Sequence, residues 1–267
     1  MKRSIIALLA LFLALEAVAW GGLGHRTVAE IAERNLTPKA KANIEKYTNG
    51  TPLSDYATWM DQIGKDPILG GKGATRGWHA SVVDSQNRAT QEVRNRVRGG
   101  RDAVTATLMF TEMFKEREKL TDSTVMFALK CLVHMIGDIH CPGHMRYEDV
   151  DGRDFERGVI VTYFGKKQKL HKVWDTSIIA SNHHGWTPKQ YAEKLDNYSK
   201  KQIKKITKGW VEDWHSDAAK DIRAAIPWAP NGSKLGEEFD KKALPLAELE
   251  LQKAGYRLAK TLNVLFK

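Results

Sequence analysis

Cysteine is scarce in this 267-residue chain, which contains only Cys131 and Cys141, and long apolar runs are absent after the first twenty residues. Two cysteines permit one disulfide at most, and their arrangement does not suggest a thiolate metal site. Because no later segment is apolar over the length of a membrane span, we expect a soluble protein without stable membrane association. Repeats, low-complexity tracts and linkers are also missing, so the sequence predicts a single domain.

The beginning of the chain has the composition of an export signal. Met1–Arg3 is short and basic, residues 4–18 are almost wholly apolar, and Ala17–Ala19 forms the small-x-small pattern that signal peptidase cleaves. We therefore predict a signal peptide over residues 1–19. The mature domain would span residues 20–267 and be secreted or periplasmic.

Cleavage at this site would make Trp20 the first residue of the mature protein. Its α-amine would then be free, and His25 follows after the glycine-rich step Gly21–Gly24. A neutral amine beside a histidine is a potential metal chelate. Trp20 could equally be an aromatic residue that happens to follow a cleavage site.

The formal net charge is strongly positive, at +10 for the whole chain and +9 without the predicted signal peptide. Such a field attracts polyanions, of which nucleic acid is the commonest. Two dense cationic stretches, Arg94–Arg101 and Lys200–Lys208, are more typical of solvated helical faces than of binding patches. Charge therefore favours a polyanionic partner without identifying one.

Helical periodicity dominates the remainder of the sequence. Apolar residues spaced three and four apart predict amphipathic helices, and Thr37-Pro38 supplies a cap followed by proline at the first helical position. The predicted helical segments are 28–36, a helix beginning at Pro38, Val93–Glu118, Ser123–His140, Thr187–Lys205 and Phe239–Phe266. The pair Gly99-Gly100 leaves open a kink or an interruption in the segment Val93–Glu118.

One strand signal is persuasive, the segment Gly158–Phe164 with sequence GVIVTYF, and Gly165–Gln168 follows it as a predicted turn. A small hairpin among many helices predicts an all-α fold. We expect one mainly helical domain with a minor β element.

His134 and Asp138 lie four residues apart inside an apolar helical pattern, which places both side chains on one face of the helix. A buried carboxylate needs a partner, and a metal ion is one such partner. The same spacing also fits a capped core histidine or a buried Asp–His hydrogen bond. His171 and Asp175 repeat the spacing further along the chain.

Further residues of the metal-ligand type surround these two pairs, and five of the nine histidines fall in such motifs. Imidazole and carboxylate together suit zinc better than calcium or magnesium. Each motif is weak alone, but the set predicts a zinc site. Its additional members are His25, Asp61, His79 and His144.

The other histidines do not fit this pattern. His140 lies six residues after His134 and should face away from it on a regular helix, so we expect it to pack or to support a ligand. His183, His184 and His215 have no matching partner pattern and are interpreted as surface residues. The tryptophans that neighbour proposed ligands, Trp59, Trp78 and Trp174, are expected to pack around the site.

Taken together, the motifs resemble the zinc-dependent single-strand nucleases of the S1/P1 family. The matching pieces are Trp20–His25 (WGGLGH), Trp59–Asp61 (WMD), Trp78-His79, His134–His144 (HMIGDIHCPGH) and Leu170–Asp175 (LHKVWD).

The resemblance implies three zinc ions in one cleft. It implies that Asp61, His79, His134 and Asp138 hold the first ion, that the amine and carbonyl of Trp20 hold the second with His25 while Asp138 bridges the pair, and that His144, His171 and Asp175 hold the third. Asp61 and Asp138 are the expected catalytic residues, and Asp138 is expected to matter most.

The implied activity is hydrolysis at the 3′ side of a phosphate by a water that zinc activates. The products would carry 5′-phosphates, and 3′-nucleotides would also lose their phosphate. The expected substrates are single-stranded DNA or RNA, because a duplex hides its base faces and does not enter a narrow cleft. We expect the enzyme to be a monomer.

Several positions depart from the family pattern. Ala80 stands where the family usually has an aromatic residue that stacks on the base, and Val82 stands where it usually has an acidic residue. Gly64, three residues after Asp61, stands where the family usually has an arginine. The segment that usually resembles DIHQPLH has Cys141 and Gly143 in place of glutamine and leucine. We therefore expect an intact metal site with weak or relocated base recognition.

Two other functions stay open at the level of sequence. A secreted zinc phospholipase C also begins with a metal-binding tryptophan, but the close spacing of Trp20 and His25 and the aspartate at Asp175 argue against it. The other alternative is an inactive, zinc-stabilised protein that binds polyanions. It would have lost its activity together with the residues replaced at Ala80, Val82 and Gly64.

Overall fold

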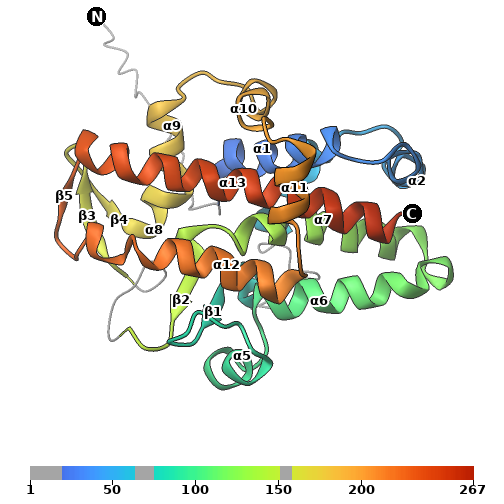
Figure 1. Ribbon diagram of the computed structural model, residues 1–267, viewed down its shortest axis with the longest axis horizontal. Helices are drawn as coiled ribbons and strands as arrows, with labels where there is room; N and C mark the ends of the chain where they lie inside the picture. Colours follow the sequence, from blue (N-terminus) through green and yellow to red (C-terminus); the bar gives the residue numbers. More distant parts are fainter. Residues whose placement is uncertain (1–19, 64–74, 151–157) are drawn as a thin grey trace, which may run out of the picture.

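The longest helix, α13 (Glu237–Leu265), runs across the middle of the molecule, and the other helices pack around it (Figure 1). The computed structural model describes residues 20–63, 75–150 and 158–267. The predicted signal peptide and Gly64 lie outside the described residues. The predicted all-α class is confirmed, since helices account for most of the described chain and the strands are few and short.

Helix α1 (Gly21–Arg34) lies directly on α13. The two helices approach closely because Gly255 has no side chain: a Cβ there would lie 2.5 Å from the Cβ of Ile31. Val28, Ile31 and Ala32 are fully buried in this contact region, as their spacing predicts. The packing fixes the beginning of α1, which carries Trp20 and His25.

Thr121 caps helix α7 (Asp122–Asp138), because its hydroxyl accepts a hydrogen bond from the backbone N–H of Thr124. Its C-terminal half is buried all round because it packs on α6 (Ala103–Met113), on α13 and on α1. The predicted helix over Ser123–His140 is thus confirmed to within two residues at its end. The burial places His134 and Asp138 in the interior rather than on a wet face.

Two predicted long helices are each divided in the structure. Gly99, with φ 61°, ends α5 (Gln91–Arg98), and Asp102 caps the following α6 by accepting a hydrogen bond from the Thr105 N–H. The predicted segment Val93–Glu118 is therefore helical in separate parts, and the Gly99-Gly100 pair interrupts it, which the sequence analysis had left open.

The segment Thr187–Lys205 also divides, into α10 (Pro188–Leu195) and α11 (Lys200–Ile206). Ser199 starts the second helix with a capping box to Gln202. Periodicity alone did not reveal this cap. The remaining helical elements are α2 (Pro38–Thr48), α3 (Leu53–Tyr56), α4 (Trp59–Ile63), η2 (Arg76–His79), η3 (Phe114–Lys119), η4 (Pro142–His144), α8 (Leu170–Lys172), η5 (Val173–Ser177), α9 (Ile178–Asn182), α12 (Val211–Arg223) and η6 (Ile226–Trp228).

The predicted hairpin exists, but its turn is shorter than expected. Strands β3 (Ile160–Tyr163) and β4 (Lys166–Lys169) pair antiparallel, so part of the predicted turn is strand. The two turn residues, Phe164 and Gly165, both have positive φ, at 43° and 78°, as tight hairpin turns require. Strand β5 (Lys234–Leu235) adds to β3 in parallel.

A second, two-stranded parallel sheet joins β1 (Ser81–Val83) to β2 (Met145–Tyr147). Three residues are too few to show strand periodicity in a sequence, so this sheet was not predicted. It ties together the chain after His79 and the chain after His144. Among the described helices, none has both the length and the apolar character needed to cross a bilayer.

Candidate metal centre

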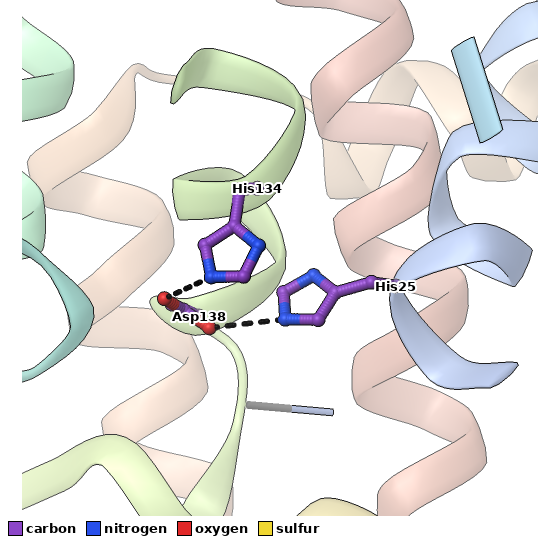
Figure 2. A group of neighbouring side chains, drawn as sticks. All are labelled: His25, His134 and Asp138. Atoms are coloured by element: carbon purple, nitrogen blue, oxygen red, sulfur yellow. Dashed lines mark ion pairs between the residues drawn. The ribbon is translucent and has the colours of Figure 1, made fainter. Parts of the chain in front are cut away.

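Asp138, at the end of α7, is the centre of the cluster. Its two carboxylate oxygens face different histidines: Oδ1 lies 3.3 Å from Nε2 of His25, and Oδ2 lies 3.2 Å from Nε2 of His134. Figure 2 shows His134 reaching down from the same helix while His25 enters from α1. The two imidazole rings stack, with centroids 4.0 Å apart. Gly137 makes room for His25, because a Cβ there would lie 2.7 Å from the ring.

The residues that the resemblance assigns to the first ion lie close together in the structure. Asp61 comes from α4 and His79 from η2, and both face His134 on α7. The Nδ1 atom of His79 lies 3.1 Å from His134 Nε2, 3.1 Å from Asp138 Oδ2 and 3.8 Å from Asp61 Oδ1. Residues from three separate segments of the chain thus direct their donors toward one another.

Trp20 lies beside this group and is fully buried. Its indole N–H donates a hydrogen bond of 2.8 Å to the carbonyl of Gly137, and its backbone N–H bonds to the sulfur of Cys141. Its φ of 42° turns the backbone at the point where α1 begins. The ring is therefore anchored in the helix that carries the ligands, with its backbone nitrogen turned toward them.

The third predicted group forms where η4, α8 and η5 meet. Asp175 Oδ2 lies 2.8 Å from His171 Nε2, and Asp175 Oδ1 lies 3.5 Å from His144 Nε2. The two imidazole rings have centroids 4.6 Å apart. A residue outside the predicted set also belongs here: the thiol of Cys141 donates a hydrogen bond of 3.0 Å to Asp175 Oδ1.

The donor set fits bound metal ions. Bonds of about 2.0–2.3 Å place neighbouring donors of a tetrahedral zinc site roughly 3.3–3.8 Å apart, and the separations around His134 run from 3.1 to 3.6 Å. Both ring nitrogens of His25, Oδ1 of Asp138 and Nε2 of His144 are buried and make no hydrogen bond among the described residues. Buried polar atoms without hydrogen bonds are costly, and a cation would satisfy them.

The charges in the cluster are arranged to hold carboxylates ionised. Burial disfavours the protonated form of His134, but nearby carboxylates, Asp138 first among them, raise its pKa to about 9. The same opposition raises the pKa of His144 to about 10. Burial would raise the pKa of Asp138, but His134 and His144 hold that pKa well below its usual range. In contrast, burial lowers the pKa of His25.

Backbone carbonyls fix the orientation of two ligand rings. Nδ1 of His134 lies 2.7 Å from the carbonyl oxygen of Ala57, which leaves Nε2 free to face the carboxylates. Nδ1 of His144 similarly contacts the carbonyl oxygen of His79. Such outer contacts select the tautomer and hold the ring still, as is common for metal-binding histidines.

Two histidines that were interpreted as surface residues are buried. His215 is fully buried and its Nδ1 lies 3.0 Å from the carbonyl oxygen of Ile139, while His183 pairs with Glu248 at 2.8 Å. That prediction is wrong for both; His184 is exposed, as expected. His140 packs inside, as expected, with its Nε2 2.8 Å from Arg257 Nη1. Sequence spacing does not reveal these partners because they come from distant helices.

The two cysteines are free and buried in the structure, so the disulfide that the sequence would permit is not formed. Cys131 lies within α7 among apolar residues. Cys141 follows the end of that helix and faces Asp175. Its position between ligand motifs was the one sequence signal that could have identified it as part of the site.

Two of the positions that depart from the family pattern lie in the chain directly after the ligand His79. Ala80 and Val82 follow His79 and are buried, Val82 within the parallel sheet opposite Arg146. No aromatic or acidic side chain is supplied by these two positions. The expectation of weak or relocated base recognition therefore stays a prediction.

Comparison with known proteins agrees with this geometry. Residues 20–267 match the family model described as S1/P1 Nuclease. The chain is 28% identical to Nuclease S1 of Aspergillus oryzae over 96% of this chain and 94% of that protein. It is 27% identical to Endonuclease 5 of Arabidopsis thaliana, over 94% of this chain and 91% of that protein. It is 25% identical to Nuclease P1 of Penicillium citrinum, over 91% and 97%.

The matched family model and the nuclease relatives identify this mainly helical chain as a hydrolase that acts on phosphodiester bonds. The chain belongs to the S1/P1 nuclease family. This membership supports the nuclease and not the phospholipase C that the sequence left open.

Proposed function

We propose that this nuclease is a secreted, zinc-dependent endonuclease that cleaves single-stranded DNA and RNA to 5′-phosphorylated products and also acts on 3′-nucleotides. Three zinc ions would be held by Trp20, His25, Asp61, His79, His134, Asp138, His144, His171 and Asp175. The observation that carries the proposal is the Asp138 carboxylate, which faces His25 with one oxygen and His134 with the other. A carboxylate in this position can bridge two cations.

When bound, zinc would lower the pKa of a water molecule and neutralise charge that develops on the phosphate. The chain's own contribution is to place the ligands and to keep the carboxylates among them ionised. Asp138 and Asp175 are fully buried and have lowered pKa values, so their carboxylates stay charged without solvent. His134 and His144 are oriented by backbone carbonyls, so their ligand nitrogens are fixed in advance.

The cluster has one side that reaches solvent. The side chains of Asp61, His79 and His171 retain 16%, 18% and 21% exposure, whereas those of His25 and Asp138 have none. A phosphate would approach from the exposed side and meet donors of the first and third groups. A flexible single strand can bring its backbone to these partly buried donors more easily than a stiff duplex.

Export would complete the site. Trp20 is buried and its backbone nitrogen lies within reach of Cys141, next to the ligand groups. If signal cleavage after Ala19 frees that nitrogen as an amine, it becomes a donor for the ion that His25 holds. We propose that the protein is active only after export, as a monomer.

The proposal is tested by purifying the form that begins at Trp20 and counting zinc per chain. Denatured DNA, RNA, 3′-AMP and phosphatidylcholine are then assayed as substrates. We expect three zinc ions, cleavage of both nucleic acids and release of phosphate from 3′-AMP. Fewer than two ions in fully loaded protein would contradict the trinuclear site, and a loaded protein that leaves denatured DNA uncut would be an inactive binder.

A further inference from the structure

Cys141, which is not among the predicted ligands, contacts the carboxylate of Asp175. Its sulfur lies 3.0 Å from Asp175 Oδ1, and His144 Nε2 lies 3.5 Å from the same oxygen. One donor atom from each of these residues lies within 4.8 Å of the others, and all three residues are buried. The sulfur is therefore placed as a member of the third donor group.

His171 contacts the other carboxylate oxygen of Asp175. Its Nε2 lies 2.8 Å from Asp175 Oδ2, and its ring lies against that of His144. Together the four residues offer one sulfur, two imidazole nitrogens and one carboxylate, all of which are donors that zinc commonly accepts. The separations of 3.0 and 3.5 Å from Asp175 Oδ1 to the donors of Cys141 and His144 are near those of donors around one ion.

A second observation points to the same place. His144 Nε2 is buried, aimed at Asp175, and makes no hydrogen bond among the described residues. A thiol donating to Asp175 does not satisfy this nitrogen, whereas one cation between the three residues would satisfy all of them. A metal ion bound beside Cys141 and Asp175 would therefore give the buried His144 nitrogen a partner.

The local backbone is also adapted to this contact. Cys141 and Gly143 are the two positions where the segment departs from the DIHQPLH pattern, and both face the same carboxylate. A Cβ at Gly143 would lie 2.5 Å from Asp175 Oδ1. The glycine therefore lets the carboxylate lie against the loop, within reach of the sulfur at Cys141.

We propose that Cys141 is a fourth protein ligand of the third metal ion, together with His144, His171 and Asp175. This inference rests on the proposed function only in requiring that the third ion binds. On binding, the thiol proton leaves to solvent and a sulfur–metal bond forms, with no change in oxidation state. A fourth protein ligand makes this ion more tightly enclosed than one held by three residues and water.

The test uses the full mature protein loaded with Co²⁺, whose bonds to thiolate give a charge-transfer band in the near ultraviolet. The variants are Cys141→Ser and, as a matched control, Cys131→Ser. Serine at position 141 keeps the size and can still donate a hydrogen bond to Asp175, so it separates metal binding from positioning. Circular dichroism checks that each variant is folded.

We expect the band in the parent protein and in Cys131→Ser, and its loss in Cys141→Ser. In a chelator titration, Cys141→Ser should lose one cobalt ion at least about 10-fold more readily than the parent. His171→Ala should lose the band together with one ion. A band that persists in His171→Ala would place the thiolate on a different ion and overturn the assignment.

The outcomes separate this inference from the proposed function. A parent protein that binds three cobalt ions without the band would show that Cys141 only positions Asp175, and the nuclease proposal would stand. A parent that binds no metal would overturn both. In zinc-loaded protein, X-ray absorption should detect a sulfur neighbour at about 2.3 Å, and this shell should be absent in Cys141→Ser.

Discussion

At the scale of single residues, the site depends on carboxylates that are buried and yet remain charged. Asp138 has no side-chain exposure and is stabilised as an anion by the histidines on either side. It could bind two cations at once because each oxygen faces a different imidazole. Neutralising this one residue should therefore affect two ions.

Asp138→Asn tests this role. The amide nitrogen cannot act as a ligand, so we expect the variant to lose at least one zinc ion per chain. Nuclease activity should fall by more than the 10–100-fold that is usual for losing a supporting contact. Metal analysis and cleavage of denatured DNA provide the measurements.

The matched control for this variant is Asp102→Asn. Asp102 is equally buried but lies at the beginning of α6, where asparagine can still cap the helix. It should keep its full metal content. The bridging role would be refuted by an Asp138→Asn protein with three ions and parental activity.

Trp20 provides a second prediction at this scale. One additional glycine before Trp20 would convert its amine into an amide and displace the chain terminus. We expect lower activity and a lost metal ion, with a melting temperature of the metal-free protein close to that of the form that begins at Trp20. Trp20→Phe is the contrasting variant, because it keeps the amine but loses the hydrogen bond to Gly137.

That phenylalanine variant should bind metal and lose about 1 kcal/mol of stability, the usual net value of such a hydrogen bond. If the extended form is as active as the form that begins at Trp20, the tryptophan is only a packing residue.

At the scale of secondary-structure elements, the position of α1 on α13 decides whether His25 reaches Asp138. The close approach of the two helices at Gly255 and Ile31 holds α1 in place. Helix α7 carries His134 and Asp138, and His25 reaches them from α1 (Figure 2). The site is thus built by helix packing and not by a single ligand-bearing loop.

Gly255→Ala tests this packing. Alanine gains about 1 kcal/mol of helix propensity, but its Cβ would overlap Ile31, and overpacking costs about 1–3 kcal/mol. We expect a net loss of stability in denaturant unfolding, together with weaker metal binding because α1 is displaced.

Gly22→Ala is the control within α1 itself. A Cβ there meets no atom within 4 Å, so the variant should be neutral or slightly stabilised. A Gly255→Ala protein that gained as much stability as Gly22→Ala would contradict the close contact with Ile31.

At the scale of the whole molecule, a buried polar network links α13 to α12. Glu250 is fully buried, with Oε1 3.0 Å from Lys253 Nζ, and Lys253 also pairs with Asp217 at 2.9 Å. Burial raises the pKa of Glu250 from 4.5 to about 7, although Lys253 and Arg257 oppose that change. The folded protein therefore holds the Glu250 proton more tightly than the unfolded chain.

This shift predicts a pH dependence of stability. The contribution of Glu250 to the free energy of unfolding is fully present below its unfolded pKa of 4.5. It is lost as pH rises through the folded pKa of about 7. Glu250→Gln cannot ionise, so its stability relative to the parent should increase between pH 5 and pH 8. The change should be on the order of 1–3 kcal/mol, given about 1.4 kcal/mol per pKa unit.

Thermal unfolding of both proteins at several pH values measures that difference. Glu237→Gln, an exposed glutamate of the same helix, should show no comparable change. A parent and a Glu250→Gln protein with parallel pH profiles would show that Glu250 ionises equally easily in the folded and unfolded states.

The sequence by itself determined the helical class, because hydrophobic periodicity is a local property. It predicted the ligand set from the His/Asp motifs together with the resemblance to the S1/P1 family. The i, i+4 pair His134/Asp138 follows from α-helix geometry. His171 and Asp175 have the same spacing, but in the structure they lie on the short helix α8 and on the π-helix η5 that follows it.

Tertiary structure decided what local spacing does not contain. It divided the predicted helix at Gly99 and buried His183 and His215, whose partners lie on other segments. It also brought Cys141 against Asp175, 34 residues further along the chain. Contacts between distant segments depend on how whole helices pack, so the sulfur that faces the third donor group became visible only in the folded molecule.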